Sequence, residues 1–214
     1  MIEEEGKKNY SEYNNNNKLY ETLFLLKNSL IYLKAKLINV NILDILEKVN
    51  FKELKELNLS NNYRISDIKV LEKVKYDKLE ILDLNGNNIP NLDILENANF
   101  KELKELNLGK NNISDIKILE KVKYDKLEIL NLAFNRISNI DIFEKVNFKD
   151  LKELYLYENK ISDIKFLEKV RFEKLEFLSL ANNEISNIDI LEKVNFKDLK
   201  ELYLYENKIT NINV

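Results

Sequence analysis

The chain of 214 residues contains no cysteine and no histidine. Without cysteine it has neither a disulfide framework nor a thiolate site. Without histidine it lacks the commonest general base and the commonest metal ligand, which excludes Ser-His-Asp, Cys-His and histidine-based zinc chemistry. Carboxylates, lysine, tyrosine and serine remain as candidate catalysts. These two absences favour a chain that does not catalyse a reaction and needs no metal or cofactor.

Glycine and long apolar runs are also scarce. The chain has three glycines, and Gly86 and Gly109 each stand alone, so neither belongs to a phosphate-binding loop. No apolar run reaches the roughly 18 residues of a membrane-spanning helix. The first residues, MIEEEGKKNYSEYNNNN, are polar and unlike a signal peptide. We therefore expect a cytoplasmic protein with a disordered polar segment over residues 1–17.

Neither sign of charge is in large excess. The chain has 34 basic and 37 acidic side chains, which gives a formal net charge of -3. A nucleic-acid-binding surface needs a basic stripe, and this balance does not supply one. We expect no nucleic-acid partner and no membrane partner.

The chain has instead a tandem repeat. Its units are 24 residues long, except for a first interval of 25, where Tyr63 or Arg64 is the extra residue in a turn. Each unit reads L-x-x-L-x-L-x-x-N-x-I-x-x-I-x-x-L-x-x-V-x-F/Y-x-x. The units open at Leu54, Leu79, Leu103, Leu127, Leu151, Leu175 and Leu199.

Two periodicities within the unit predict two kinds of element. The L-x-x-L-x-L stretch alternates, which predicts a short strand with one buried face. Apolar residues from Ile116 to Val122 have helical spacing, which predicts a short helix on the opposite side. Ser114 and Asp115, with Ser162 and Asp163 two units later, are suitable N-cap residues for such helices. Helices need more room than strands, so the array should curve with its strands inside.

The repeated pattern resembles leucine-rich-repeat proteins, whose signature is L-x-x-L-x-L-x-x-N-x-L. Its N-x-I-x-x-I-x-x-L continuation is most similar to the cytosolic, phosphatase-regulator and internalin-like class, here with 24-residue repeats. The resemblance implies an α/β solenoid, a curved right-handed superhelix. Its parallel β-sheet would lie on the concave face and its short helices on the convex face.

The two ends of the array depart from the pattern. Leucines spaced by three and four predict a capping helix over residues 18–29, with an alternative that runs on to Leu37. Residues 30–53 follow the repeat imperfectly and are interpreted as a degenerate first unit. Residues 54–214 hold seven repeats, the last incomplete. A truncated product, a frayed unit, or an edge covered by a partner or second copy would explain the incomplete end. We favour the first two together and expect a monomer whose C-terminal edge is able to pair.

The ninth position of each unit is asparagine. Asparagine has two amide donors and one acceptor, so at a buried turn it can satisfy backbone groups of its own loop and the next. We interpret this ladder as structural rather than functional. Its members are Asn62, Asn87, Asn111, Asn135, Asn159, Asn183 and Asn207.

The third, fifth, seventh and eighth positions are expected to face solvent on the concave face, where the resemblance implies that partners bind. Aromatic side chains gather there in the C-terminal half, beside small residues, as interface anchors do. The alternative is simple strand composition, since tyrosine favours strands and one aromatic pair is a copy of the other. The predicted partner-binding residues are Tyr155, Tyr157, Tyr203, Tyr205, Phe134, Phe177, Ile129, Glu153 and Glu201.

The carboxylates recur identically, whereas catalytic carboxylates are singular and differ in environment. We expect Glu105, Glu153 and Glu201 to pair with the lysine that precedes each of them in the sequence. The sequence therefore predicts no enzyme, but a module that binds another protein on the concave face, mainly through its C-terminal half. Two alternatives stay open: a regulatory subunit of an enzyme such as a protein phosphatase, and glycan binding through the tyrosine face.

Overall fold

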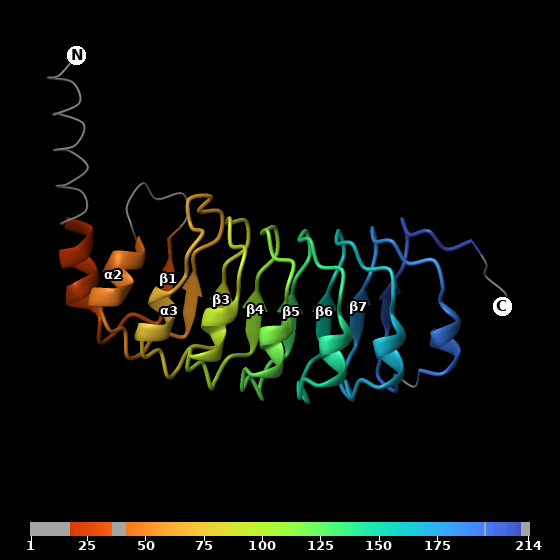
Figure 1. Cartoon of the computed structure of the whole chain (residues 1–214). Coiled ribbons are helices and arrows are strands. Elements are labelled where there is room, and N and C mark those ends of the chain that lie inside the picture. The colour runs from red at the N-terminus through yellow and green to blue at the C-terminus, as the bar shows by residue number, and fades with distance from the viewer. Residues whose placement is uncertain (1–17, 36–41, 195, 211–214) are drawn as a thin grey trace, which may run out of the picture.

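The computed structural model describes residues 18–35, 42–194 and 196–210. The segment predicted to be disordered, residues 1–17, lies outside them. Within the described residues, eight strands form one parallel sheet in chain order (Figure 1). The strands are β1 (Tyr32–Lys34), β2 (Glu56–Asn58), β3 (Ile81–Asp83), β4 (Glu105–Asn107), β5 (Ile129–Asn131), β6 (Glu153–Tyr155), β7 (Phe177–Ser179) and β8 (Glu201–Tyr203).

Adjacent strands pair in register, so that each residue lies beside the residue at the same position of the next unit. Leu57 pairs with Leu82, which in turn pairs with Leu106. These three central leucines point inward and are fully buried, whereas their flanking residues are half exposed. The predicted parallel-sheet solenoid is confirmed.

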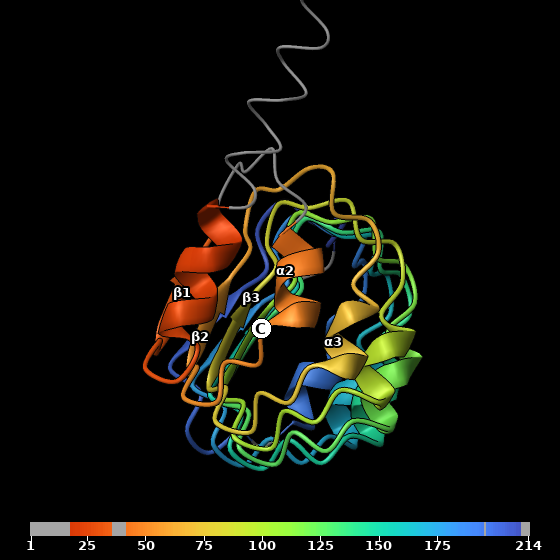
Figure 2. The same ribbon diagram turned by 90° about the vertical axis from the view of Figure 1, so that its left-hand side faces the viewer.

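Short helices form the opposite side of the array (Figure 2). Two are α-helical, α2 (Ile42–Lys48) and α3 (Val70–Lys73). The later ones are single 3₁₀ turns, which are slimmer than the short helices predicted from the apolar spacing. They are η1 (Asp93–Glu96), η2 (Lys117–Glu120), η3 (Asp141–Glu144), η4 (Lys165–Glu168) and η5 (Asp189–Glu192).

The predicted N-cap residues lie one or two positions too early. The N-cap of η2 is Ile116, which makes no side-chain capping bond. Asp115 still serves the turn, because its Oδ1 accepts a hydrogen bond from the backbone N–H of Lys117 over 2.9 Å. Asp163 does the same for Lys165. The aspartate therefore orders the entry to the turn from just outside it.

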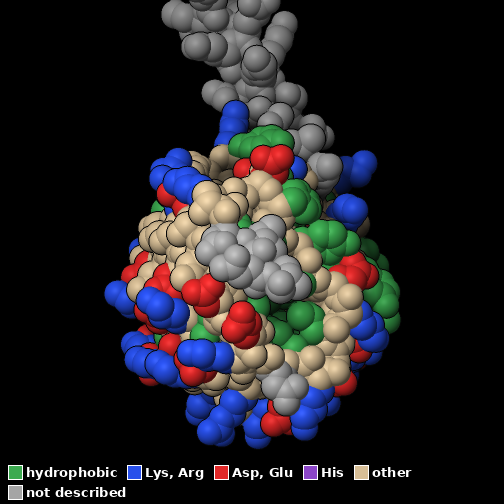
Figure 3. Space-filling view, turned by 90° about the vertical axis from the view of Figure 1, so that its right-hand side faces the viewer, with side chains coloured by type: hydrophobic (Ala, Val, Ile, Leu, Met, Phe, Trp, Pro, Cys, Tyr) green, Lys and Arg blue, Asp and Glu red, His purple; other side chains and the backbone are tan. Residues whose placement is uncertain are grey.

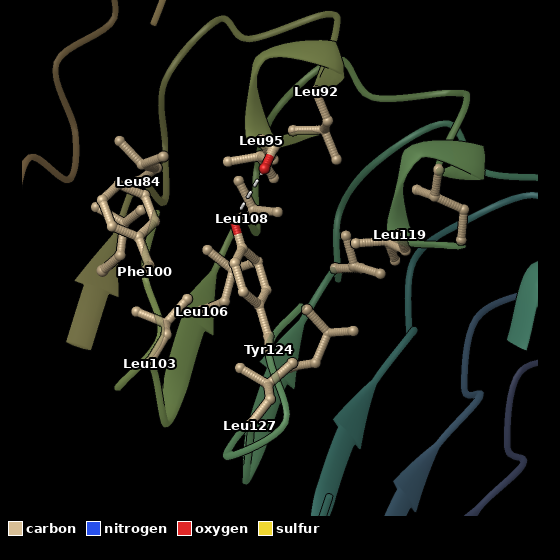
Figure 4. Close-up of a cluster of buried hydrophobic side chains, with 14 of the residues drawn as sticks. Leu84, Leu92, Leu95, Phe100, Leu103, Leu106, Leu108, Leu119, Tyr124 and Leu127 are labelled. Atoms are coloured by element: carbon tan, nitrogen blue, oxygen red, sulfur yellow. Dashed lines mark hydrogen bonds between the residues drawn. The ribbon is translucent and has the colours of Figure 1, made fainter. Parts of the chain in front are cut away.

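The core fills the space between the sheet and the outer turns (Figure 4). Leu106 from β4 and Leu108 just after it meet Leu95 and Leu119 from the turns, and all four are almost fully buried. Tyr124 lies among them, and its hydroxyl donates a long hydrogen bond of 3.5 Å to the carbonyl of Leu95. Neighbouring units contribute to the same space, so the burial of each unit depends on the next.

The N-terminal edge of the array is covered. Residues 18–26 are helical, and the buried Leu23 with the partly buried Leu19 and Tyr20 attaches them to the core. A turn and then β1 follow, so this helix does not run on to Leu37. Of the described helices, none is long and apolar enough to cross a membrane.

The C-terminal edge is more open. Within the described residues β8 pairs with β7 alone, and its central Leu202 is half buried where the equivalent Leu178 is fully buried. Hydrophobic side chains show among charged ones at this end (Figure 3). The last unit therefore has less burial to stabilise it than the units inside the array.

Candidate binding face

The outward positions of the strands and of the turns that follow them form one surface, which we call the sheet face. Its third-position row runs across the strands and alternates between acidic and apolar side chains from β2 onward. In chain order the row holds Tyr32, Glu56, Ile81, Glu105, Ile129, Glu153, Phe177 and Glu201. The in-register pairing thus converts a sequence repeat into a line of side chains about 4.8 Å apart.

Six rings in the C-terminal half of this face form a connected group, the aromatic array. Phe177 lies between Tyr155 and Tyr203, with ring centroids 4.7 and 5.3 Å away. Tyr157 lies 6.5 Å from Tyr155 and 5.1 Å from the ring of Phe134. Tyr205 extends the group by a perpendicular contact of 6.1 Å with Tyr203. The structure therefore brings all the predicted aromatic residues together. The predicted Ile129, Glu153 and Glu201 lie in the same third-position row as Phe177.

The small residues among the rings do not face solvent, contrary to the expectation for the fifth and seventh positions. Ser179 is 4% exposed, and Ala133 and Ala181 are at most 1% exposed. Larger neighbours cover these short side chains. Three of the rings are exposed, Phe134 and Tyr203 at 38% and Tyr205 at 60%, whereas Tyr155, Tyr157 and Phe177 are half-buried. The rings of the array therefore form an apolar surface above the buried small residues.

Two of the tyrosine hydroxyls are held by carboxylates of the third row. Tyr155 donates to Glu153 over 2.6 Å, and Tyr203 donates to Glu201 over 2.7 Å. The hydrogen bond that Tyr203 donates to Glu201 raises the pKa of Tyr203, and desolvation together with the bond to Glu153 raises the pKa of Tyr155. Both hydroxyls therefore stay protonated at physiological pH, and each ring is fixed in orientation by its own strand.

The predicted pairing of glutamates with adjacent lysines is wrong. Lys104 bonds to Glu80 of the preceding strand over 2.6 Å instead of to Glu105. Lys152 likewise pairs with Glu128, and Lys200 with Glu176. Successive residues of a strand point to opposite sides, whereas the same position of the next strand lies about 4.8 Å away. Most ion pairs of the described residues therefore join neighbouring units, and the pairs within a unit, such as Lys165 with Asp163, lie on the helix side.

The third-row glutamates are consequently left without a cation. Within the described residues no ion pair involves Glu56, Glu105, Glu153 or Glu201. Desolvation raises the pKa of Glu105, and the nearby charges of Asp83, Glu56 and Glu153 raise it further. The middle of the sheet face is thus an uncompensated negative region.

The asparagine ladder sits behind the sheet face, in the turns after the strands. Asn111 donates through Nδ2 to the carbonyls of Leu108 in its own unit and Leu84 in the preceding one, each over 3.0 Å. Its Oδ1 accepts from the backbone N–H of Ile89. The neighbour served is the preceding unit, and not the next one as the sequence suggested. These bonds link successive turns, which supports a structural role for the ladder.

The eighth position carries a feature that the sequence analysis missed. Its residue has a positive φ in each described unit from β2 onward, including 54° at Phe134 and 56° at Glu158. Glycine or asparagine is suited to this conformation, and the signal was present in Asn61, Gly86 and Asn182 at the same position. The left-handed residue turns the chain away from the strand and lifts the Phe134 side chain onto the sheet face.

The described part of the helix side carries shallower features. Two shallow grooves lie between neighbouring 3₁₀ turns, one beside Ser114 and Lys117 and the other beside Ser162 and Lys165. The second is the first repeated two units later, which identifies both as products of the repeat. In the described part of the chain no group of three or more acidic residues is placed to hold a metal ion.

Comparison with protein families identifies the repeats that build this surface. The family described as Leucine Rich repeats (2 copies) matches residues 125–169 and 173–214, and Leucine Rich repeat matches residues 102–116. The chain contains leucine-rich repeats. A search of curated proteins finds no significant match.

Solved leucine-rich-repeat structures share the fold. Internalin C2 (inlC2) of Listeria monocytogenes is 26% identical with a TM-score of 0.69, over 83% of this chain and 72% of its own. Internalin inlF of the same species is 25% identical with a TM-score of 0.67, over 82% of this chain. The match spans 48% of the inlF chain, about half its length.

A third leucine-rich-repeat structure contains a bound partner. It is the ectodomain of the plant membrane receptor kinase GASSHO1/SCHENGEN3 of Arabidopsis thaliana, in complex with CASPARIAN STRIP INTEGRITY FACTOR 2. It is 25% identical with a TM-score of 0.60, over 78% of this chain and 20% of its own.

Proposed function

We propose that the chain is a non-catalytic module that binds another protein on its sheet face, mainly through the C-terminal half. The aromatic array carries this proposal. Its six connected rings, three of them exposed, form a contiguous apolar patch, and such patches on protein surfaces commonly mark interaction sites. Tyrosines whose hydroxyls are fixed by carboxylates lose little side-chain freedom on binding.

The comparisons support a binding role in general terms. A leucine-rich-repeat ectodomain similar to this chain has been solved in complex with a partner. The non-catalytic part of the proposal is supported by the third-row glutamates, which recur at one position of the repeat rather than as a single differentiated pair. A cytoplasmic location belongs to the same proposal.

The test is affinity capture with the full chain as bait, followed by mass spectrometry. We expect the quadruple variant Tyr155→Ser, Tyr157→Ser, Tyr203→Ser and Tyr205→Ser to lose the captured partner while its circular dichroism spectrum stays native. The matched control is Tyr63→Ser with Tyr32→Ser, since both side chains are about two-thirds exposed, at 67% and 65%, but lie away from the array. A quadruple variant that retains every partner would refute the proposal.

The same experiment separates the two alternatives. Recovery of a protein phosphatase by the native bait, and its loss with the quadruple variant, would identify the chain as a regulatory subunit. Glycan binding would appear as retention on immobilised oligosaccharides, since exposed tyrosine rings can also stack on sugars. Neither alternative has a supporting observation beyond those that support protein binding.

A further inference from the structure

The charge of the sheet face differs from that of its rim. At the rim, the second-position lysines and glutamates alternate and neutralise each other, with Glu80 held between Lys55 at 3.0 Å and Lys104 at 2.6 Å. On the face itself, acidic side chains outnumber basic ones. The acidic residues are Glu56, Asp83, Glu105, Glu153, Glu158, Glu201 and Glu206, and the basic ones are Lys34 and Lys110. A partner that covers this face must bring positive charge to compensate it.

The spacing of the acidic residues restricts the form of that partner. Glu56, Glu105, Glu153 and Glu201 occupy every second strand of the third row, which places them about 10 Å apart. An extended polyproline-II segment rises about 3.1 Å per residue and returns to the same side every third residue, so its repeat is about 9 Å. Such a segment, laid across the strands, would present a side chain to each glutamate in turn.

The rings add a second means of recognising the same chemistry. Cations bind over the faces of tyrosine and phenylalanine rings. The chain already contains such a contact on this face, where Lys110 Nζ lies 5.2 Å from the centroid of the Phe134 ring. Phe177 lies in the third row directly between Glu153 and Glu201. A basic side chain at this point would meet carboxylate and ring together, and apolar side chains of the segment would meet Ile81, Ile129 and Phe177.

From the charge of the face, its period and its rings, we propose that the partner is an extended cationic segment with lysine or arginine at every third residue. The segment runs along the third row, across the strands, with apolar side chains among its intervening residues. This inference rests on the proposed function, because it names the class of partner that the same face accepts.

The test uses a labelled peptide of four consecutive Lys-Pro-Leu triplets, titrated with the full chain and followed by fluorescence anisotropy. A peptide of the same composition with its lysines grouped at one end is the control for spacing. We expect saturable binding that weakens as salt is added, and about ten-fold tighter binding of the triplet peptide than of the grouped one. Absence of saturable binding, or equal affinity for the two peptides, would overturn the proposal.

Variants locate the binding on the face. The double variant Glu105→Gln and Glu153→Gln should weaken binding of the triplet peptide at least about five-fold, since each lost ion pair costs a few-fold in affinity. The matched control, Glu53→Gln and Glu102→Gln, removes the same charge from residues that pair with Lys78 and Lys126 outside the third row. It should change the affinity less than two-fold, and equal weakening by both variants would contradict the proposed placement.

The outcomes also distinguish this inference from the function on which it rests. If the triplet peptide fails to bind while native partner capture still depends on the four tyrosines, the cationic segment is wrong and protein binding on the sheet face stands. If the quadruple tyrosine variant captures every partner as before, the proposed function falls and this inference falls with it.

Discussion

At the eighth position of each described unit from β2 onward, the backbone adopts a left-handed conformation that most of the side chains there do not favour. Asn61 and Gly86 suit it, whereas Lys110, Phe134 and Glu158 do not. A non-glycine side chain in such a conformation carries a cost of about 1 kcal/mol or more. Hydrogen bonds between successive turns hold these residues in place.

Replacing Glu158 by asparagine should therefore stabilise the chain. Asparagine tolerates a positive φ, and we expect the free energy of unfolding to rise by up to about 1 kcal/mol, measured by urea denaturation. Gly86→Ala should do the reverse, because its new Cβ would lie 2.7 Å from Asn61 Oδ1 at a φ of 67°. If Glu158→Asn were neutral and Gly86→Ala stabilising, backbone conformation would not limit this position.

Two buried tyrosines, Tyr76 and Tyr124, occupy the equivalent position of different units and differ in the hydrogen bonding of their hydroxyls. Tyr76 is fully buried, and its hydroxyl has no hydrogen-bond partner among the described residues. Burial also raises its pKa, which keeps the hydroxyl neutral. Tyr76→Phe should raise the free energy of unfolding by about 1 kcal/mol, because it removes an unsatisfied polar group.

Tyr124→Phe is the matched control, since this hydroxyl does donate to Leu95. Its removal should be neutral or slightly destabilising in the same denaturation experiment. A loss of stability in the Tyr76 variant as large as that in the Tyr124 variant would show that the Tyr76 hydroxyl is satisfied in solution.

Between elements, the asparagine ladder is the main polar link. Asn111→Ala would leave the N–H of Ile89 without its acceptor, whereas the carbonyls of Leu84 and Leu108 would each keep one bond from a neighbouring asparagine of the ladder. We expect a loss of about 1–3 kcal/mol in the free energy of unfolding. Asn207→Ala should cost clearly less, because Asn207 is half exposed and water can replace its bonds. Equal losses at the two positions would contradict this role of burial.

The two kinds of glutamate on neighbouring strands should respond to pH in opposite directions. Hydrogen bonds from Lys104 and Lys55 lower the pKa of Glu80 from 4.5 to about 2. Its stabilising contribution is complete above pH 4.5 and is lost as the pH falls from 4.5 to about 2. Glu80→Gln should therefore flatten the acid branch of the stability profile.

Glu105 behaves differently because its folded pKa is raised, chiefly by desolvation. Its ionised form opposes folding above the unfolded pKa, so Glu105→Gln should stabilise the chain at pH 7 and lose that advantage once the native glutamate is protonated in acid. Denaturation at pH 7 and in mild acid measures both variants. A destabilised Glu105→Gln at pH 7 would show that this carboxylate has a stabilising partner.

The sequence predicted the features that depend on its periodicity, and it did not predict the contacts between side chains of different units. The strands, the ladder and the position of the rings follow from periodicity, because register is fixed once Leu54 and its equivalents align. The ion pairs of Lys104 and Lys152 did not follow, since adjacency in sequence is a poor guide where parallel strands bring residues one unit apart together. The sequence also did not predict the 3₁₀ form of the outer turns, because apolar spacing over a single turn does not distinguish a 3₁₀ turn from an α-helix.

For the whole molecule, the site was predicted in outline and not in detail. The sequence placed Tyr155, Phe177 and Tyr203 on one surface, but it could not show that their rings touch or that Ser179 is covered. Both depend on how side chains of different strands lean toward each other, which a periodic pattern does not contain. For the same reason, the sequence did not predict that the carboxylate of Glu105 has no cationic partner among the described residues.

Stability should fall toward the C-terminal end of the array. Leu106 and Leu108 are fully buried between two neighbouring units, whereas Leu202 and Leu204 are half buried against one. In a solenoid each unit is stabilised mainly by its neighbours. Hydrogen-exchange mass spectrometry should show β8 exchanging well before β4, and uniform protection along the array would indicate that something covers the last strand.

The alternating rim has a consequence for how such a gene can change length. Across the strands the second position reads Lys55, Glu80, Lys104, Glu128, Lys152, Glu176 and Lys200. Deleting or duplicating a single unit would set two like charges side by side, whereas a change of two units preserves the alternation. Recombination that adds or removes coding sequence should therefore be tolerated best in steps of two units, which makes a pair of repeats the favoured increment of length.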